Sequence, residues 1–302
     1  MAHYTNHAIE FQDTADASAT ILGSLSQVST PIESDVQYSE TSGTYYPEHV
    51  SVAAVMPKFS ASSFDIKKCI DYFGVVGKMI EEDTGKVGTA IYQAYYNDAA
   101  ISAGATHRRL RMAKAFVKLG TISVGHRSDA QVGLEGTGLY DETNAPVLIE
   151  ASQSLPTLPA SSGRWTIASV SIGGIAVNCN LSLDIDFGIS ETAFGCDSNT
   201  FDTMLNLSSV QPKVTFTSLD IEGFADAKVP LLGLAGTHAN TIIKLRKRAH
   251  GTAGFVADGT AEHITLTADG VLLATEAHSA SGNQQAQASF EMHCKWDGTN
   301  AP

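Results

Sequence analysis

The sequence contains an internal repeat of about one domain's length, and this repeat limits the possible folds more than any other feature. The segment Asp129–Pro146, DAQVGLEGTGLYDETNAP, recurs 156 residues later as Gln285–Pro302, QAQASFEMHCKWDGTNAP, with eight identities in eighteen positions. A second pair has nearly the same offset, namely PKFSASSFDI at Pro57–Ile66 and PKVTFTSLDI at Pro212–Ile221. Solenoid units are only ~20–50 residues long, so this period is that of a whole domain.

We therefore expect two homologous domains in tandem, residues 1–151 and 164–302. The stretch between them, SQSLPTLPASSG at 152–163, is rich in Ser and Pro and predicts a linker. Shorter echoes support the same division. Ser42, Thr44 and Tyr45 correspond to Ser198, Thr200 and Phe201, and His107 and Leu110 correspond to His263 and Leu266.

Hydrophobic periodicity predicts a mainly β fold. From Ile175 to Ile189 every odd residue is apolar: Ile175, Val177, Cys179, Leu181, Leu183, Ile185, Phe187 and Ile189. A period of two predicts one long strand with a buried face and a wet face. Gly173-Gly174 joins it to a shorter strand at 165–172 through a tight hairpin turn.

Further strands are expected at 50–54, 107–119, 122–124, 130–140, 205–210, 263–266, 271–274 and 286–296. Turn residues separate many of them, among them Asp269-Gly270. Each copy is therefore expected to be a β-sandwich or barrel of roughly eight strands.

One short helix is expected in each copy, flanking the strands. Ser62-x-x-Asp65 and Thr217-x-x-Asp220 have the form of a capping box, and Ile66, Ile70 and Phe73 follow at helical spacing. The second helix is expected to be the shorter one, because Gly223 and Pro230 limit it to about two turns.

Composition argues against several classes of protein. The net charge is −13, and a nucleic-acid clamp needs a basic face. The first twenty residues lack the charged start and apolar core of a signal peptide. The sequence has no run of about eighteen apolar residues, so no membrane span is expected. The four cysteines, Cys69, Cys179, Cys196 and Cys294, are expected to be free thiols, with a Cys179–Cys196 bridge as the alternative.

No catalytic motif is present, so we expect neither an enzyme nor a cofactor. Nucleophile-elbow, phosphate-loop, H-E-x-x-H and calcium-loop patterns are all missing. His293 and Cys294 are adjacent on a predicted strand and point to opposite faces, so no metal site is expected. Asp141 and Asp297 could form an acid/base pair, but they lie in different copies. Each begins an Asp-x-Thr-Asn turn, in which hydrogen bonding from the side chain to the backbone explains an aspartate.

Two basic clusters stand out in this acidic chain. One is HRRLRMAKAFVK at His107–Lys118, which contains Arg108, Arg109 and Arg111. The other is KLRKR at Lys244–Arg248, which contains Arg246, Lys247 and Arg248. They could contact an acidic surface on a neighbouring subunit, form a solvated face, or bind nucleic acid. Phe116 is the single aromatic residue available for base stacking within them, so nucleic acid is the weakest of the three interpretations.

The order of these elements resembles the major tail tube proteins of long-tailed bacteriophages. The second copy has a strand pair ending in LSLDIDFGISET, a Ser-x-Thr-aromatic turn, the segment SSVQPKVTFTSLDI leading into a short helix, H-x-x-L strands and a final DGTNAP. The first copy alternates less regularly at its start, in VSTPIESDVQYSETSGTYYP. The long strand arm is therefore expected in the second copy.

The resemblance implies self-assembly into stacked rings around a channel for genomic DNA, in the virion tail, after synthesis and assembly in the host cytoplasm. It implies no enzymatic activity, and partners that are other copies of the chain and other tail proteins at the tube ends. It also implies that a subunit with two domains forms trimers with pseudo-sixfold symmetry. An acidic surface suits a channel through which a polyanion must slide.

Within this interpretation, the self-assembly residues are the predicted strand arm and the basic clusters. They are Ile175, Val177, Leu181, Leu183, Ile185, Phe187, Arg108, Arg109, Arg111, Arg246, Lys247 and Arg248. Two alternatives remain: a distal tail, baseplate ring or capsid decoration protein, and a carbohydrate- or receptor-binding protein. Only two tryptophans are present, so platforms for stacking on sugars are few.

Overall fold

A computed structural model describes residues 3–39, 46–47, 49–97, 100–102, 106–159, 163–195, 200–226, 236–249, 254–257, 262–282 and 285–295. The fold is mainly β, as predicted. The elements of the first half are β1 (His3–Gln12), β2 (Thr20–Leu22), β3 (Leu25–Ser29), β4 (Ile32–Ser39), β5 (His49–Ser63), α1 (Ile66–Phe73), β6 (Lys78–Glu81), β7 (Gly88–Asn97), β8 (Ala100–Ile101), β9 (His107–Met112), β10 (Lys114–Gly125), β11 (Gln131–Leu139) and β12 (Leu148–Gln153).

The second half contains a shorter set of elements. They are β13 (Arg164–Ile172), β14 (Ile175–Val177), β15 (Asn180–Asp186), β16 (Ile189–Phe194), β17 (Met204–Val210), β18 (Lys213–Ser218), α2 (Ile221–Asp226), β19 (Gly236–Arg248), β20 (Ile264–Ser279) and β21 (Gln287–Cys294). Strand β12 continues to Gln153, so Ser152 and Gln153 of the predicted linker belong to a strand. The irregular part described begins at Ser154.

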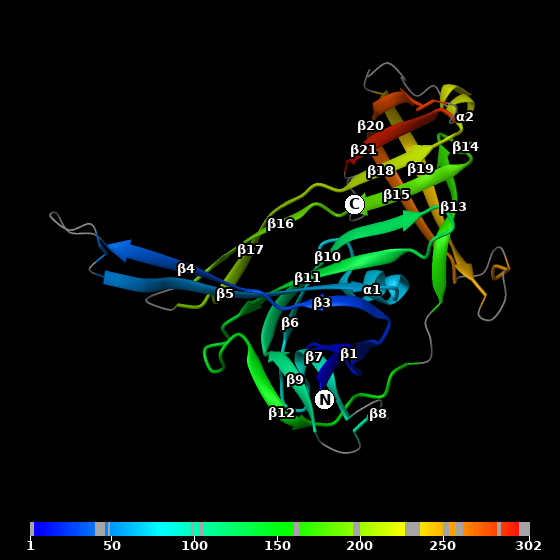
Figure 1. Ribbon diagram of the computed structural model, residues 1–302. Coiled ribbons are helices and arrows are strands. Elements are labelled where there is room, and N and C mark those ends of the chain that lie inside the picture. The colour runs from blue at the N-terminus through cyan, green and yellow to red at the C-terminus, as the bar shows by residue number, and fades with distance from the viewer. Residues whose placement is uncertain are drawn as a thin grey trace.

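Within the described residues, the strands form one sheet of six, one of thirteen and a separate two-stranded ribbon. The six-stranded sheet has the order β12-β9-β7-β1-β2, with β8 beside β7. The larger sheet has the order β14-β13-β19-β20-β21-β18-β15-β10-β11-β5-β3, with β4 beside β5 and β6 beside β10. Figure 1 shows this sheet continuing from the upper part of the molecule, near α2, into the centre, near α1. The two halves therefore share a sheet.

The same pairing order occurs in both halves. In the first half β2, β1, β7 and β9 are neighbours, and in the second half β14, β13, β19 and β20 are neighbours in the same way. Likewise β10-β11-β5-β3 corresponds to β20-β21-β18-β15. Strand β20 is the counterpart of both β9 and β10, because it runs without a break through Asp269 and Gly270. The predicted turn at these two residues is therefore wrong.

The repeated Pro-Lys segments end in a Ser-x-Asp motif that binds the same backbone in each half. Ser63 Oγ accepts the N–H of Asp65 at 3.0 Å, and Ser218 Oγ accepts that of Asp220 at 3.0 Å. The carboxylate of Asp65 accepts the N–H of Ser24, and that of Asp220 accepts the N–H of Asn178. These bonds fix the start of α1 and α2 to the segment entering β3 or β15.

Both helices lie where they are predicted, but the capping box is wrong. The hydrogen-bonding residues are Ser63 and Ser218, one position beyond Ser62 and Thr217. Asp65 makes no side-chain cap hydrogen bond to α1, whereas Asp220 accepts the N–H of Gly223 at 3.0 Å. The apolar face of α1 is buried at Ile66, Cys69 and Phe73, because residues three and four apart share one helix face.

The His-x-x-Leu echo also has a structural explanation. His107 Nδ1 accepts the N–H of Tyr95 at 2.9 Å, and His263 Nδ1 accepts that of Lys247 at 3.1 Å. Each histidine begins or immediately precedes a strand and satisfies a backbone donor on the neighbouring strand. The repeated histidines are therefore structural residues of the sheet.

The predicted fifteen-residue strand from Ile175 to Ile189 is wrong as a single element. The chain bends at Cys179, where φ is +52°, and again at Gly188, where φ is +56°. The result is three strands, β14, β15 and β16. The predicted hairpin between β13 and β14 is confirmed, with positive φ at both Gly173 and Gly174. Alternation predicts which side of a strand is buried, but a bend that preserves the alternation leaves the pattern intact.

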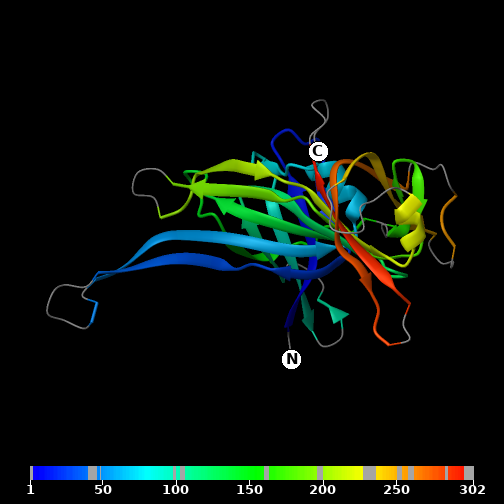
Figure 2. The same ribbon diagram turned by 90° about the horizontal axis from the view of Figure 1, so that it is seen from above.

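The longest projections of the molecule are two hairpins, β4·β5 and β16·β17. Figure 2 shows both leaving the body on the same side, with β4·β5, coloured blue, reaching further. Strand β5 is fifteen residues long, and its last residues pair with β3 and β11 inside the large sheet. The expectation that the second copy alone carries a long arm is therefore wrong.

Candidate assembly interface

Strands β10 and β15 join the two halves of the chain. They pair antiparallel from Thr121↔Asp186 to Gly125↔Ser182. Along the same edge of β10, residues Lys114–Val117 pair instead with β6. The backbone of β10 is thus hydrogen-bonded on both sides, and the large sheet crosses from one half to the other.

The counterparts of these two strands lie at open edges. In the repeat, β3 corresponds to β15, since both pair with the strand of the Pro-Lys segment and both have a bulge at the same place, between Leu25 and Gln27 and between Asn180 and Ser182. Among the described residues, β3 pairs with β5 alone. The end of β20, the counterpart of the end of β10, pairs with β21 but has no described partner on its other side beyond Leu272.

One face of the large sheet is polar across the junction. Residues opposite one another in register share a face, so Gln131, Ser123, Asp184, Thr215 and Glu291 form one row across five strands. The charged side chains on this face of β10, β11, β15, β18 and β21 are four carboxylates, Glu135, Asp184, Asp186 and Glu291, and three lysines, Lys114, Lys118 and Lys213.

All three lysines are neutralised by neighbouring carboxylates, and Lys114 lies 3.0 Å from Glu81. Lys213 lies 3.3 Å from Glu291, and Lys118 lies 3.4 Å from Glu135 and 2.5 Å from Glu191. Two depressions open on the same face, lined by side chains that include Ser123 and Asp186. The face therefore presents small polar groups with a carboxylate excess.

The β16·β17 hairpin of the second half packs across the first half. Val55 in β5 donates its N–H to the carbonyl of Thr200 at 2.8 Å, and Tyr140 donates its N–H to the carbonyl of Asp202 at 2.8 Å. The rings of Tyr140 and Phe201 lie 6.1 Å apart. Phe201 belongs to one of the sequence echoes, but its counterpart Tyr45 lies outside the described residues.

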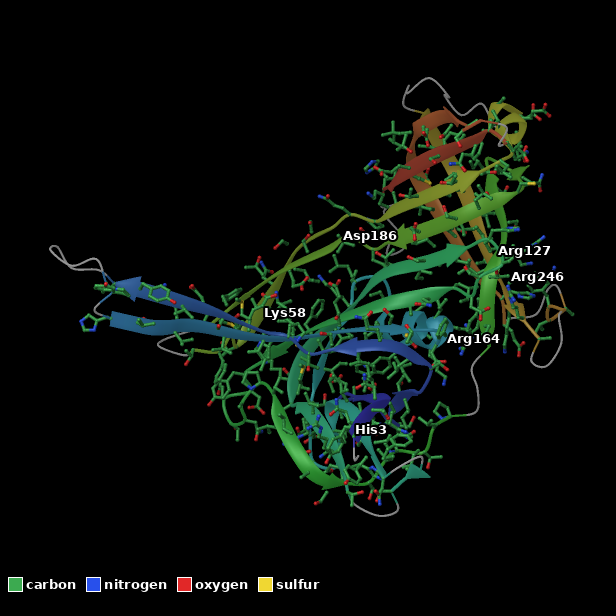
Figure 3. The ribbon with its side chains drawn as sticks, viewed as in Figure 1. His3, Lys58, Arg127, Arg164, Asp186 and Arg246 are labelled. Carbon is green, nitrogen blue, oxygen red and sulfur yellow. The ribbon has the colours of Figure 1, made fainter. Side chains whose placement is uncertain are left out.

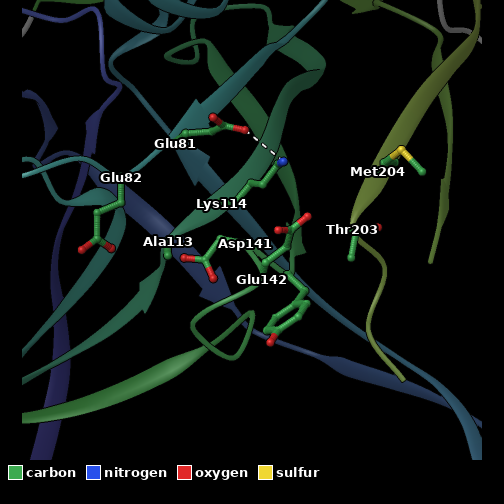
Figure 4. A pocket seen from close by; sticks show the side chains of 9 residues that line it. Glu81, Glu82, Ala113, Lys114, Asp141, Glu142, Thr203 and Met204 are labelled. Carbon is green, nitrogen blue, oxygen red and sulfur yellow. Dashed lines mark ion pairs between the residues drawn. The ribbon is translucent and has the colours of Figure 1, made fainter. Parts of the chain in front are cut away.

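A pocket lies where this hairpin meets the first half (Figure 4). It is lined by Glu81, Glu82, Ala113, Lys114, Tyr140, Asp141, Glu142, Thr203 and Met204. Lys114 pairs with Glu81 at 3.0 Å, as the dashed line in Figure 4 marks. Asp141 is already bound, because it accepts the N–H groups of Thr143 at 2.9 Å and Asn144 at 2.5 Å. The predicted turn role of Asp141 is confirmed, and Asp297 lies outside the described residues.

The predicted apolar row of self-assembly residues divides into two groups. Val177, Leu183, Ile185 and Phe187 are buried in the core of this chain. Ile175 is 38% exposed, and Leu181 is half-buried. Leu183 and Ile185 lie in β15, which pairs with β10 and β18 of the same chain. They therefore stabilise the fold of the single chain.

The first basic cluster finds its partners within the chain. Arg109 pairs with Glu150 at 2.5 Å, and Arg111 pairs with Glu82 and with Glu150. Arg108 donates to the amide oxygen of Gln93 at 2.5 Å and stacks on the ring of Tyr4. The acidic surface that balances this cluster is therefore that of β12 and its neighbours in the same chain.

The second basic cluster lies at the edge where β13 and β19 meet the first half (Figure 3). Lys247 pairs with Glu262 at 3.3 Å, and Arg246 stacks on Phe255. Arg248 lies 3.5 Å from Asp129, which Arg164 also approaches at 3.8 Å. These last contacts join the second half to a carboxylate of the first. A role for either cluster between subunits stays a prediction.

Metal and membrane features are few in the described part of the chain. Within it, no three His, Cys, Asp or Glu side chains lie together in a way that could hold a metal ion. None of its helices is long and apolar enough to cross a membrane. Cys69, Cys179 and Cys294 are free thiols, and Cys196 lies outside the described residues.

The site is thus a set of strand edges, a polar sheet face and two hairpins. Sequence reasoning missed Lys118, Val55 and Tyr140, which hold the second-half hairpin against the first half. The aligned repeats contain these positions, but a sequence echo does not say which half packs on which. In comparisons with known proteins, no family model matches the chain and no curated protein matches it.

Proposed function

We propose that the chain is a structural subunit of a phage tail tube, built from two tandem homologous domains that assemble into stacked rings. The observation that carries this proposal is the β10·β15 pairing between the halves together with the open edges of their counterparts, β20 and β3. Repeating the internal contact between chains pairs β20 of one chain with β3 of the next. Such a head-to-tail contact generates a ring if the rotation closes.

Around such a ring, β10·β15 junctions within a chain alternate with β20·β3 junctions between neighbouring chains. Three chains with two copies each make a ring of six similar units, which agrees with the trimer of pseudo-sixfold symmetry that the family resemblance implies. Pairing also covers the sheet edges, which otherwise invite aggregation. A ring of this kind requires a second copy of the chain and no other partner.

The polar face of the large sheet suits the wall of a DNA channel. Its four carboxylates outnumber its three lysines, and all three lysines are ion-paired. A polyanion slides past such a wall because repulsion keeps the phosphates from binding. We infer that Asp184 and Asp186 line the channel, in a virion tail.

The edge pairing can be tested with a proline in β3. Lys58 donates its N–H to the carbonyl of Pro31 at 2.9 Å, which makes Lys58/Pro31 and Ser60/Ser29 the hydrogen-bonded pairs of β3 and β5. The next pair along, Val28/Ala61, is then a non-hydrogen-bonded pair, so the N–H of Val28 points away from β5 toward the open edge. Val28→Pro removes this donor without breaking a bond to β5.

We expect the wild-type chain to form tubes in negative-stain electron microscopy. Val28→Pro should remain unassembled, with circular dichroism and urea unfolding close to wild type, and Val28→Ala should still form tubes. Normal tubes from Val28→Pro would contradict the edge pairing. Wild-type rings that never stack would instead favour a baseplate or distal tail component, and a wild-type chain that stays monomeric would contradict the function.

A further inference from the structure

The two projecting hairpins are built to one pattern. In β4·β5, Val36 faces Val52 and Tyr38 faces Val50, with a bulge between Asp35 and Val36. In β16·β17, Glu191 faces Leu207 and Ala193 faces Leu205, with a bulge between Ser190 and Glu191. The bulges therefore align, and each position of one hairpin has a defined counterpart in the other.

In the second half, the first half covers part of the hairpin face that carries Glu191, while Leu207, which faces Glu191, is 41% exposed. Lys118 in β10 binds the carboxylate of Glu191 at 2.5 Å and the carbonyl of Ile189 at 2.9 Å. Leu205, on the same face, packs against the core. The opposite face, with Thr192 and Phe194, is exposed.

The corresponding face of the β4·β5 hairpin is exposed and apolar. The exposed fractions are 37% for Val36, 65% for Tyr38, 59% for Val50 and 49% for Val52. The other face of this ribbon carries polar side chains, among them Gln37 and Ser51. A two-stranded ribbon with a continuous bare apolar face is typical of a surface that another chain covers.

The receiving surface can be located through the repeat. Lys118 faces Glu135 in β11, and at the corresponding position Leu273 in β20 faces Glu291 in β21. The ion pair Lys118–Glu191 within the chain thus corresponds to Leu273 and Val36, both apolar. Leu273 is only partly buried in the single chain. Both members of the pair are charged in one copy and both are apolar in the other, as a contact between them requires.

We propose that the β4·β5 hairpin of one chain docks on the second half of the neighbouring chain, with Val36 against Leu273. This inference rests on the proposed ring, because the hairpin reaches the same neighbour whose β20 pairs with β3. The occupant of the apolar face is therefore a second copy of this chain. The proposed contact between chains has the same geometry as the contact that the β16·β17 hairpin makes with the first half of its own chain.

A charge cycle tests the contact. Val36→Glu and Leu273→Lys each place one unpaired charge in the interface, whereas the double variant recreates the Lys118–Glu191 pair. Each single variant should raise the critical concentration for tube assembly about tenfold or more, the size expected for burying an unpaired charge. The double variant should return most of the way to the wild-type concentration.

The matched control is Gln37→Glu, which places the same charge on the opposite face of the hairpin and should leave assembly unchanged. Urea unfolding of the unassembled single chains verifies that the variants fold. Single variants that assemble like wild type, or a double variant no better than the worse single one, would overturn the docking while leaving the tube function standing. A wild-type chain that never assembles overturns both proposals.

Discussion

The ammonium of Lys118 on β10 lies 2.5 Å from the carboxylate of Glu191 on β16, so an ion pair joins the two halves of the chain. Their side chains are only 13% and 16% exposed, and the same lysine also binds the carbonyl of Ile189 at 2.9 Å. The pair lies where the second-half hairpin leaves the body. It therefore fixes the direction in which that hairpin projects.

Removing one member of this pair should destabilise the chain. Lys118→Met leaves Glu191 largely buried without its cation, and we expect the free energy of unfolding to fall by about 1–3 kcal/mol, less than for a fully buried pair because some solvent reaches it. Urea unfolding of the single chain measures the change. Replacing both residues, with Lys118→Leu and Glu191→Val, should recover most of the loss, since it installs the apolar pair that the other hairpin uses.

The exposed pair Lys67–Asp71 on α1 provides the control. Its side chains are 42% and 61% exposed, so Lys67→Met should change the free energy of unfolding by less than about 0.5 kcal/mol. Equal losses at the two lysines would show that Lys118 has no special role between the halves.

Gly188 is expected to tolerate no side chain. Its φ is +56°, and a Cβ there would lie 2.1 Å from the backbone carbonyl oxygen of Gln211. Gly188→Ala should therefore destabilise the chain by roughly 1–3 kcal/mol, from backbone strain and from forcing β16 and β17 apart. Thermal unfolding followed by circular dichroism measures this.

Gly120, in β10, offers a comparison with little strain. A Cβ there would lie 3.6 Å from its nearest atoms, and its φ is outside the left-handed region. Gly120→Ala should leave the melting temperature nearly unchanged. If both alanine variants melt like wild type, the bend at Gly188 does not require a glycine.

Asp141 should contribute to stability in a pH-dependent way. Burial raises the pKa of this carboxyl, but hydrogen bonds from Asn144 and from the N–H of Thr143 lower it by more, so its pKa lies below the ordinary value. A group with a lowered folded-state pKa stabilises the fold above its unfolded pKa of about 3.9, and this stabilisation is lost as the pH falls through the folded-state pKa.

Asp141→Asn should therefore be less stable than wild type at pH 6, and the difference should shrink as the pH falls below about 4. Urea unfolding at a series of pH values measures the difference. Glu142→Gln, at the adjacent carboxylate, is the control for the loss of one negative charge, because the hydrogen bonds of this turn go to Asp141. If the difference in the free energy of unfolding between wild type and Asp141→Asn stays constant with pH, the hydrogen bonds to Asp141 do not favour its charged form.

Local patterns in the sequence determined much of the secondary structure. Alternating apolar residues predicted β11, β17 and β21 because side chains on successive strand residues point to opposite faces. The spacing of Ile66, Ile70 and Phe73 predicted α1, because residues three and four apart share one face of a helix. The Gly173-Gly174 turn followed from the backbone freedom of glycine.

The repeat also predicted which positions correspond between the halves, and strand pairing follows that correspondence. The repeat did not predict which segments of the chain pack against one another. Leu183 and Ile185 were expected to form an assembly surface, but their side chains are buried in the core of this chain and their strand pairs with β10. The arginines at 109 and 111 read as a free basic cluster, but Glu150 and Glu82 balance them.

The physical reason is that alternation, helical spacing and turn residues depend on residues close together in the chain. The burial of a strand face and the neutralisation of a charged side chain depend instead on segments far apart in the chain. The sequence by itself determined a mainly β chain with a two-fold internal repeat. Only the tertiary structure decided that β16·β17 is covered while β4·β5 lies bare. This is so because β15, which leads into β16·β17, pairs with β10 of the same chain, whereas β3, which precedes β4·β5, pairs among the described residues with β5 alone.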